Sequence, residues 1–414
     1  MTLPPGPSPG PCATAPGWTG GPGFILFVAA LMAVLSLSLD ILLPAFPAMA
    51  ASYGLADAGE SRLTLTVFVL AFGLGHLLHG ALADRFGRRP VLSWALVVFA
   101  ACGVWAALAP GFDQHLAARF VQGLAAAGPR VVAVALLRDT REGPGLARDM
   151  SRVMMIFMLA PILGPVLGQG IMAAAGWRAI PLVLALAALV PLAITWLVLP
   201  ETLPPGARRA LDPASYGRTL TGLLRTRVTV GNTLAAGMAY GLMFGFIGIS
   251  PALYQTRFGV GEGFAALFST VGLGIAAGSW LNARIVTRAG PAPVLRRAAR
   301  GLVVCGAALA GFGLAPPPLV LFQAVLVAAM VCMGFAFANC SALAIAPHRH
   351  VAGQAAALTG AMTISLSAVV AEALGRAYAV SFTLFGAGWL AGAVAVLALV
   401  AAANPQPAGP GGRG

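Results

Sequence analysis

Asp40 is the side chain of this sequence with the clearest potential for chemistry. It lies within the first of several long apolar runs, and it is the acid placed deepest in the first half of the chain. A charge inside a membrane costs about 2.5–3.5 kcal/mol on insertion scales, so such residues are usually functional. We therefore interpret Asp40 as a group that takes up and releases a proton. The alternative is an acid that ends a helix just before Pro44.

Arg119 is the basic residue that we expect to meet Asp40. Counted along helices that rise 1.5 Å per residue, Asp40 lies about 12 Å and Arg119 about 6 Å from helix ends on the same side of a membrane. This similar depth predicts a side-chain pair in which Arg119 tunes proton exchange at Asp40. A purely structural bridge between the two residues is the alternative.

The composition indicates a membrane protein. The chain has 414 residues, of which 59% are hydrophobic and only 9% are charged. Soluble domains carry about 25% charged residues, and apolar runs of about 20 residues favour helices over a barrel. We expect twelve spans, at residues 24–48, 63–82, 91–109, 116–137, 152–175, 179–199, 229–253, 264–283, 298–315, 317–341, 352–374 and 378–402.

The arginines predict the orientation of these spans. Nineteen of the 25 basic residues, all arginine, fall in alternate loops and the C-terminal tail, whereas five fall at the opposite ends of the spans. The positive-inside rule then places both termini in the cytoplasm. The same distribution accounts for the net charge of +13 without nucleic acid as a partner.

A proline-rich link divides the chain into two halves. We expect a disordered cytoplasmic tail at 1–22, a six-helix half at 23–200, a cytoplasmic linker at 201–228, a second six-helix half at 229–403 and a disordered tail at 404–414. Leu82-Ala-Asp-Arg85 after the second span is echoed by Leu281-Asn-Ala-Arg284 after the eighth. Matched halves are typical of a transporter with its site at their interface.

Four motifs resemble those of the major facilitator superfamily. The first is the turn between the second and third spans, with Gly80, Asp84, Arg85, Gly87, Arg88 and Arg89. The second is Arg119-x-x-Gln122-Gly123, and the third is Asp40-x-x-x-Pro44. The fourth, in the fifth span, is similar to the Gly-Pro motif of drug:proton antiporters and holds Pro161, Gly164, Pro165 and Gly168. Together they resemble the Bcr/CflA multidrug efflux subfamily over residues 24–402.

The resemblance implies an all-helical membrane fold of twelve spans in two six-helix halves, with both termini inside. In that fold the arginine-rich turn would act as a conformational latch. Asp84 would dock on the N-terminus of the eleventh span, near Val351, where a helix carries partial positive charge. The alternative is a turn that signals only the topology of the chain.

Glycines in two spans predict a close contact between the halves. The small residues of the fifth span would pack on the eighth span, which carries Gly274 and Gly278. This contact would govern the rocking of one half against the other. The alternative for these glycines is ordinary packing between membrane helices.

The substrate cavity is expected to be apolar and adaptable, because Met and aromatic surfaces suit varied ligands. The candidate lining residues, each of which could instead pack in the core or against lipid, are His76, Gln122, Arg130, Met155, Met158, Tyr240, Met243 and Phe244. His76 and His79 share a helix face, and we expect them to line the pathway or handle protons rather than bind a metal. Glu372 and Arg376 are expected to form a local pair.

These features predict a transporter and no enzyme. We expect proton-coupled efflux of small amphipathic drugs or antibiotics across the bacterial inner membrane by alternating access, driven by the proton gradient without cofactor or metal. The expected partners are a small-molecule substrate, protons and the lipid bilayer, and the chain is expected to be a monomer. The alternative is a proton-coupled exporter of a metabolite such as an amino acid or a sugar. A membrane enzyme or a sensor is disfavoured, because the sequence shows no catalytic motif, no nucleotide-binding loop and no long extramembrane segment.

Overall fold

The computed structural model describes residues 18–19, 21–56, 58–141, 145, 149–150, 152–153, 160–204, 206, 208 and 213–405. These residues form helices joined by short turns. The first half holds α1 (Pro22–Asp40), η1 (Leu43–Ala45), α2 (Phe46–Tyr53), η2 (Ala58–Arg62), α3 (Leu63–Phe86), α4 (Arg88–Leu108), α5 (Phe112–Thr140), α7 (Ala160–Ala175) and α8 (Ala179–Leu197). The second half follows α9 (Pro213–Arg225) and holds α10 (Arg227–Phe258), η4 (Gly261–Gly263), α11 (Phe264–Ala289), α12 (Pro291–Gly311), α13 (Leu319–Ile345), η5 (Ala346–Val351), α14 (Ala352–Val380) and α15 (Phe382–Ala403).

The all-helical membrane fold predicted from the sequence is confirmed. Ten helices among the described residues are long and apolar enough to cross a membrane. The expected fifth span is represented by α7, whose predicted start at 152 falls where only part of the chain is described. The expected ninth span corresponds to α12, which begins earlier than predicted. The apolar run missed the first turns of this helix, because they carry Arg296, Arg297 and Arg300.

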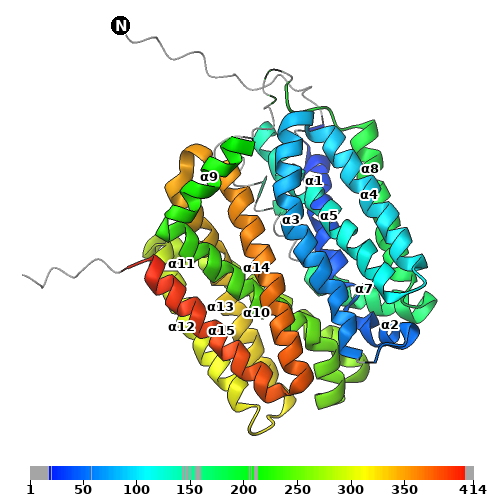
Figure 1. Cartoon of the computed structure of the whole chain (residues 1–414), viewed down its shortest axis with the longest axis vertical. Coiled ribbons are helices and arrows are strands. Elements are labelled where there is room, and N and C mark those ends of the chain that lie inside the picture. Colours follow the sequence, from blue (N-terminus) through cyan, green and yellow to red (C-terminus); the bar gives the residue numbers. More distant parts are fainter. Residues whose placement is uncertain are drawn as a thin grey trace, which may run out of the picture.

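The two halves lie side by side in Figure 1, with α1 to α8 on the right and α10 to α15 on the left. Within the first half α5 packs on α3 and α4, and within the second α10 packs on α14 and α11 on α13. Between the halves, α3 packs on α14 and α7 packs on α11. The predicted contact of the fifth span with the eighth is therefore present.

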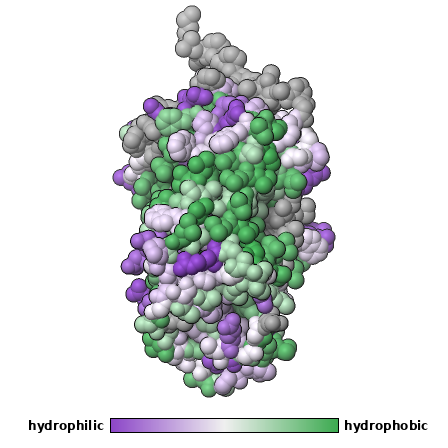
Figure 2. Space-filling model, turned by 90° about the vertical axis from the view of Figure 1, so that its right-hand side faces the viewer, coloured by the Kyte–Doolittle hydropathy of each residue, from purple (hydrophilic) through white to green (hydrophobic). Residues whose placement is uncertain are grey.

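The bundle has two ends, which we name by the helices that they carry. The α9 end also holds the turn from α3 to α4, and the α2 end holds the start of α3 (Figure 1). Figure 2 shows one face of the first half, where hydrophobic side chains cover a broad area. Exposed apolar residues such as Trp94, Leu186 and Val190 belong to this half, and in a membrane their natural neighbour is lipid.

The linker between the halves contains a helix, because Pro213 begins α9. Proline is tolerated in the first turn of a helix because the amide hydrogens there have no partner within the helix. Leu220 and Leu223 of α9 pack with Leu358 of α14 and Leu77 of α3, so the linker contacts both halves at the α9 end.

Candidate functional site

A cavity of about 380 Å³ lies between the two halves. Its walls come from α1, α3 and α5 on one side and from α10, α11, α13 and α14 on the other. It runs from the middle of the bundle toward the α9 end, since it is lined near there by the last residues of α13 and the first turns of α14. A pocket of this size suits a drug-sized molecule.

Asp40 lines this cavity as the last residue of α1. Only 4% of the residue is exposed. The described part of the chain places no hydrogen bond or ion pair on its carboxylate. A carboxyl group in that position can exchange a proton with water or a ligand in the cavity. Asp40 also ends its helix, as the alternative interpretation predicted.

The Gly-Pro motif of α7 positions Asp40. A side chain on Gly164 would place its Cβ only 2.8 Å from the Cβ of Asp40, and one on Gly168 would meet the backbone carbonyl of Ile41. These glycines therefore allow α7 to lie directly against the end of α1. The side chains of Pro161 and Ile162 fall outside the described residues, whereas Pro165 is buried inside the helix.

Arg119 contacts the backbone of α1 near Asp40 but forms no ion pair with the Asp40 side chain. Its guanidinium donates hydrogen bonds to the backbone carbonyl of Ser38 at 2.9 Å and to Oε1 of Gln122 at 2.6 Å. It also lies over the ring of Phe68 at 4.2 Å from the centroid. No ion pair within 4 Å joins Arg119 to Asp40, both of which are described, so the predicted side-chain pair is absent from this conformation. Arg119 instead holds the α1 backbone two residues before Asp40.

Five of the eight predicted cavity residues line the cavity: His76, Arg130, Tyr240, Met243 and Phe244. Gln122 does not. It is fully buried, and its amide donates to the carbonyl of Phe99 while its oxygen accepts from Arg119. Met155 and Met158 lie outside the described residues.

The two histidines occupy different surroundings. Both donate a ring N–H to the carbonyl one turn earlier, His76 to Phe72 at 2.9 Å and His79 to Gly75 at 3.0 Å. His76 lines the cavity, but His79 is buried against Gly128 of α5. The prediction that both line the pathway is wrong for His79, because a residue three positions along α3 has rotated into the packing with α5. Among the described residues, no group of three or more His, Cys, Asp or Glu could hold a metal.

Several lining residues were missed by the sequence analysis. Phe337 of α13 stacks on Tyr240 with 3.8 Å between the ring centroids and an interplanar angle of 11°. Polar residues of the second half add Asn232, Thr233, Ser341, Thr359 and Thr363. On α14 the signal was available, since Ala356, Thr359 and Thr363 repeat at three- and four-residue spacing along one face.

The predicted role of Gly274 and Gly278 is corrected by the structure. A side chain on either residue would meet α13, at Val327 and Met330 for Gly274 and at Val331 for Gly278. Gly164 and Gly168 likewise face α1. The atoms nearest to these glycines thus belong to the same half in each case, and the alternative of ordinary packing between membrane helices holds for the glycines of α11.

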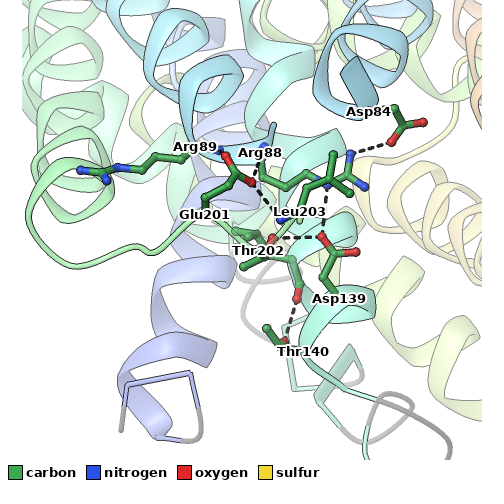
Figure 3. A network of polar contacts seen from close by, with 9 residues as sticks. Asp84, Arg88, Arg89, Asp139, Thr140, Glu201, Thr202 and Leu203 are labelled. Atoms are coloured by element: carbon green, nitrogen blue, oxygen red, sulfur yellow. Dashed lines mark hydrogen bonds and ion pairs between the residues drawn. The ribbon is translucent and has the colours of Figure 1, made fainter. Parts of the chain in front are cut away.

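The arginine-rich turn is tied into its own half (Figure 3). Gly87 joins α3 to α4 with φ of +105°, which glycine adopts without steric cost. Arg88 donates to Asp84 at 2.6 Å and to Asp139 of α5 at 3.1 Å. Arg89 points away from this cluster and donates to the carbonyls of Thr195 and Trp196 near the end of α8. Arg85 lies over Phe86.

Glu201 is the carboxylate that caps a helix in this region. Its two oxygens accept the backbone N–H groups of Arg88 and Arg89, the first residues of α4, at 2.9 and 3.2 Å. A carboxylate at this position stabilises the partial positive charge of the helix N-terminus. Asp84 is not docked on α14 here, since it pairs with Arg88. The sequence analysis predicted a carboxylate on a helix N-terminus but missed Glu201.

The halves are joined by a polar contact at the α2 end. Glu372 of α14 lies 3.7 Å from Arg62 and accepts a hydrogen bond from Thr66 of α3 at 3.3 Å. The predicted pair of Glu372 with Arg376 is present at 2.9 Å. Glu372 therefore does more than predicted, because it also bridges the halves. Arg62 lines a second hollow of about 530 Å³ at the α2 end, so this contact lies between that hollow and the central cavity.

We expect Glu372→Arg to loosen the α2 end, because it replaces an attraction with repulsion from Arg62. A partly buried pair contributes about 1 kcal/mol, or about five-fold in the ratio of two conformations. Hydrogen exchange of the amides between 62 and 69 should accelerate by about that factor. The double variant Arg62→Glu with Glu372→Arg should restore the slow rate, and Arg376→Gln should leave it unchanged. A double variant as fast as the single one would show that the contact does not hold the end closed.

The fold and the site define a membrane transporter of two helical halves around a central cavity. The sequence matches the Major Facilitator Superfamily over residues 26–371, and the chain belongs to this family. It is 30% identical to an uncharacterized MFS-type transporter, YdgK of Bacillus subtilis, over 355 residues that cover 85% of this chain and 88% of that protein. It is also 30% identical to a chloramphenicol resistance protein of Pseudomonas aeruginosa over 370 residues, covering 85% and 84%. A solved D-xylose-proton symporter shares the fold with a TM-score of 0.71 at 15% identity, covering 92% of this chain and 99% of that one. The chain is therefore a multi-pass protein of the inner membrane and a transporter rather than an enzyme.

Proposed function

We propose that the protein exports small amphipathic drugs or antibiotics in exchange for protons, by alternating access. The observation that carries this proposal is the carboxyl group of Asp40, which is buried at a cavity between the halves and has no protein partner among the described residues. The similarity to a chloramphenicol resistance protein supports drug efflux, and the motifs support the Bcr/CflA subfamily.

Exchange follows from competition for one carboxyl group. A substrate that interacts with ionised Asp40 expels its proton, and a proton that returns from the other side of the membrane displaces the substrate. Each unit of pH difference supplies about 1.4 kcal/mol per proton, and each 100 mV about 2.3 kcal/mol per charge moved. The proton gradient is thus a sufficient source of energy, and the proposal needs no cofactor.

The arginine distribution supports an orientation with both termini in the cytoplasm. The α9 end then faces the cytoplasm and the α2 end faces outward. In this orientation the central cavity extends toward the cytoplasm, and the contact of Arg62 with Glu372 closes the outer side. That arrangement suits the uptake of a compound from inside the cell by a single chain.

The arginine-rich turn is proposed to report the state of the two halves. Gly80 lies next to α14, where an added Cβ would be 3.9 Å from Ala357. The side chain of Asp84 is 41% exposed, so it can exchange Arg88 for a partner on α14 when the halves rock. Gly87, Arg88 and Arg89 stay fixed by Glu201 and α8 in this scheme.

Proton release tests the proposal. Purified protein in detergent and weak buffer receives chloramphenicol and a panel of amphipathic antibiotics, and binding and pH are recorded together. We expect binding to release protons into the solution, in proportion to the occupied sites. Binding without release would contradict antiport. Release evoked by amino acids or sugars, and by none of the drugs, would favour the exporter of a metabolite.

A further inference from the structure

Arg130 gives the cavity a feature that drug efflux alone does not require. It lies on α5 and lines the cavity. An arginine inside a membrane is costly, and such residues mark pathways for ligands or ions. Arg130 follows Arg119 by eleven residues, which on a helix is about 16 Å of rise on nearly the same face. Arg119 is fully buried beside Ser38 and Gln122, whereas Arg130 faces the space between the halves.

The surroundings of Arg130 are aromatic. Arg130 lines the same cavity as Tyr240 of α10 and His76 of α3. The Tyr240 ring centroid lies 3.8 Å from that of Phe337 and 6.2 Å from that of Phe244. The cavity wall is therefore an aromatic cluster here, against which the aromatic body of a ligand can pack.

Asp40 and Arg130 place opposite charges at two depths of one cavity. They are the carboxylate and the guanidinium of its described lining. Asp40 lies just beyond Ser38, whose carbonyl Arg119 binds, and Arg130 lies about 16 Å further along α5 toward the α9 end. A cation alone is repelled by Arg130, and an anion alone favours the protonated form of Asp40, which opposes exchange. A ligand with a positive group at one end and a negative group at the other is attracted to both residues.

We propose that the preferred substrates are elongated aromatic zwitterions, with the ammonium group at Asp40 and the carboxylate or another planar anion at Arg130. A guanidinium binds such anions through two parallel hydrogen bonds. The aromatic body lies against Tyr240 and Phe337. This inference rests on the proposed function, because the ammonium group takes the place of the proton on Asp40.

Three probes that share one aromatic body test the proposal. They are a para-linked aminomethyl biphenyl carboxylic acid, its methyl ester and the biphenyl carboxylic acid without the amine. Affinities are measured by calorimetry on detergent-purified wild type, Arg130→Gln, Arg130→Lys and Arg138→Gln. Arg138 is a matched control, because it lies on the same helix and is exposed outside the cavity.

We expect wild type to bind the zwitterion about ten- to hundred-fold more tightly than the ester, the range for a hydrogen bond between charged groups. Arg130→Gln should remove that advantage and leave the affinity for the ester unchanged or raised. Arg130→Lys should retain part of the advantage, and Arg138→Gln should retain all of it. Equal affinity for zwitterion and ester in wild type, or no binding of any probe, would overturn the proposal. The proposal would also be overturned if Arg130→Lys and Arg130→Gln bind the zwitterion as wild type does while thermal melting shows that both variants are folded.

Proton release in the same titrations separates this inference from the proposed function. If zwitterion and ester bind equally and both release protons, proton exchange at Asp40 is supported and the anion site at Arg130 is contradicted. If the zwitterion binds through Arg130 and releases no proton, the anion site is supported and proton antiport is contradicted.

Discussion

Asp40→Asn is expected to abolish accumulation driven by a proton gradient while leaving the protein folded. In proteoliposomes with a pH difference of two units, wild type that exchanges one proton per substrate can sustain a concentration ratio of about 100, since each unit is a factor of ten. The variant should reach a ratio of about one, because an amide cannot release a proton. Exchange of labelled for unlabelled substrate, which needs no net proton movement, should persist. The measurement is uptake of a compound that evokes proton release from wild type.

Asp113→Asn is the matched control for Asp40→Asn. Asp113 lies in the first turn of α5 at the α2 end and is exposed. Its substitution removes a carboxylate of the same chemistry without touching the cavity, so accumulation should match wild type. Accumulation by Asp40→Asn equal to that of Asp113→Asn would assign proton coupling to another residue and remove Asp40 from the mechanism.

Features set by local chemistry could be predicted from the sequence. The apolar runs indicated the helices, because backbone groups in lipid must be satisfied within each span. The isolated acid Asp40 was found at the cavity for a related reason, since a charge in an apolar run needs a functional context. Arg130 and His76 were found in the same way. In each case the evidence lies in the residue and its immediate neighbours along the chain.

Features set by the rotation of a helix could not be predicted. Arg119 and Asp40 have similar depth, but depth leaves open which way each side chain points, and Arg119 points to the carbonyl of Ser38. His79 lies one turn from His76 and yet packs on Gly128. Glu201 was not predicted, because nothing in the sequence indicates that the first backbone amides of α4 are its partners. Its acceptance of two backbone N–H groups depends on where α8 ends in space.

Among glycine-to-alanine substitutions in the first half of the chain, Gly168→Ala is expected to cause the largest loss of stability and transport. A Cβ at this position would overlap the backbone carbonyl of Ile41, which is fixed by its place directly after α1. Backbone cannot rotate away as the end of a side chain can, so α7 and the end of α1 must separate. Overpacking of this kind costs about 1–3 kcal/mol. We expect the midpoint of thermal unfolding to fall by about 2–5 °C, and transport to fall at least ten-fold, because Asp40 moves with Ile41.

Gly170→Ala isolates the cause of that loss. Gly170 lies two residues further along α7, and no atom lies within 4 Å of the position that its added Cβ would take, so the methyl group meets open space. Both substitutions raise helix propensity equally, by about 1 kcal/mol relative to glycine, and only Gly168→Ala creates the overlap. Gly164→Ala, which meets the side chain of Asp40 at 2.8 Å, should fall between the two. If all three variants melt and transport alike, the Gly-Pro motif has no part in positioning the proton site. If they rank as expected, the motif acts by setting how closely α7 approaches Asp40.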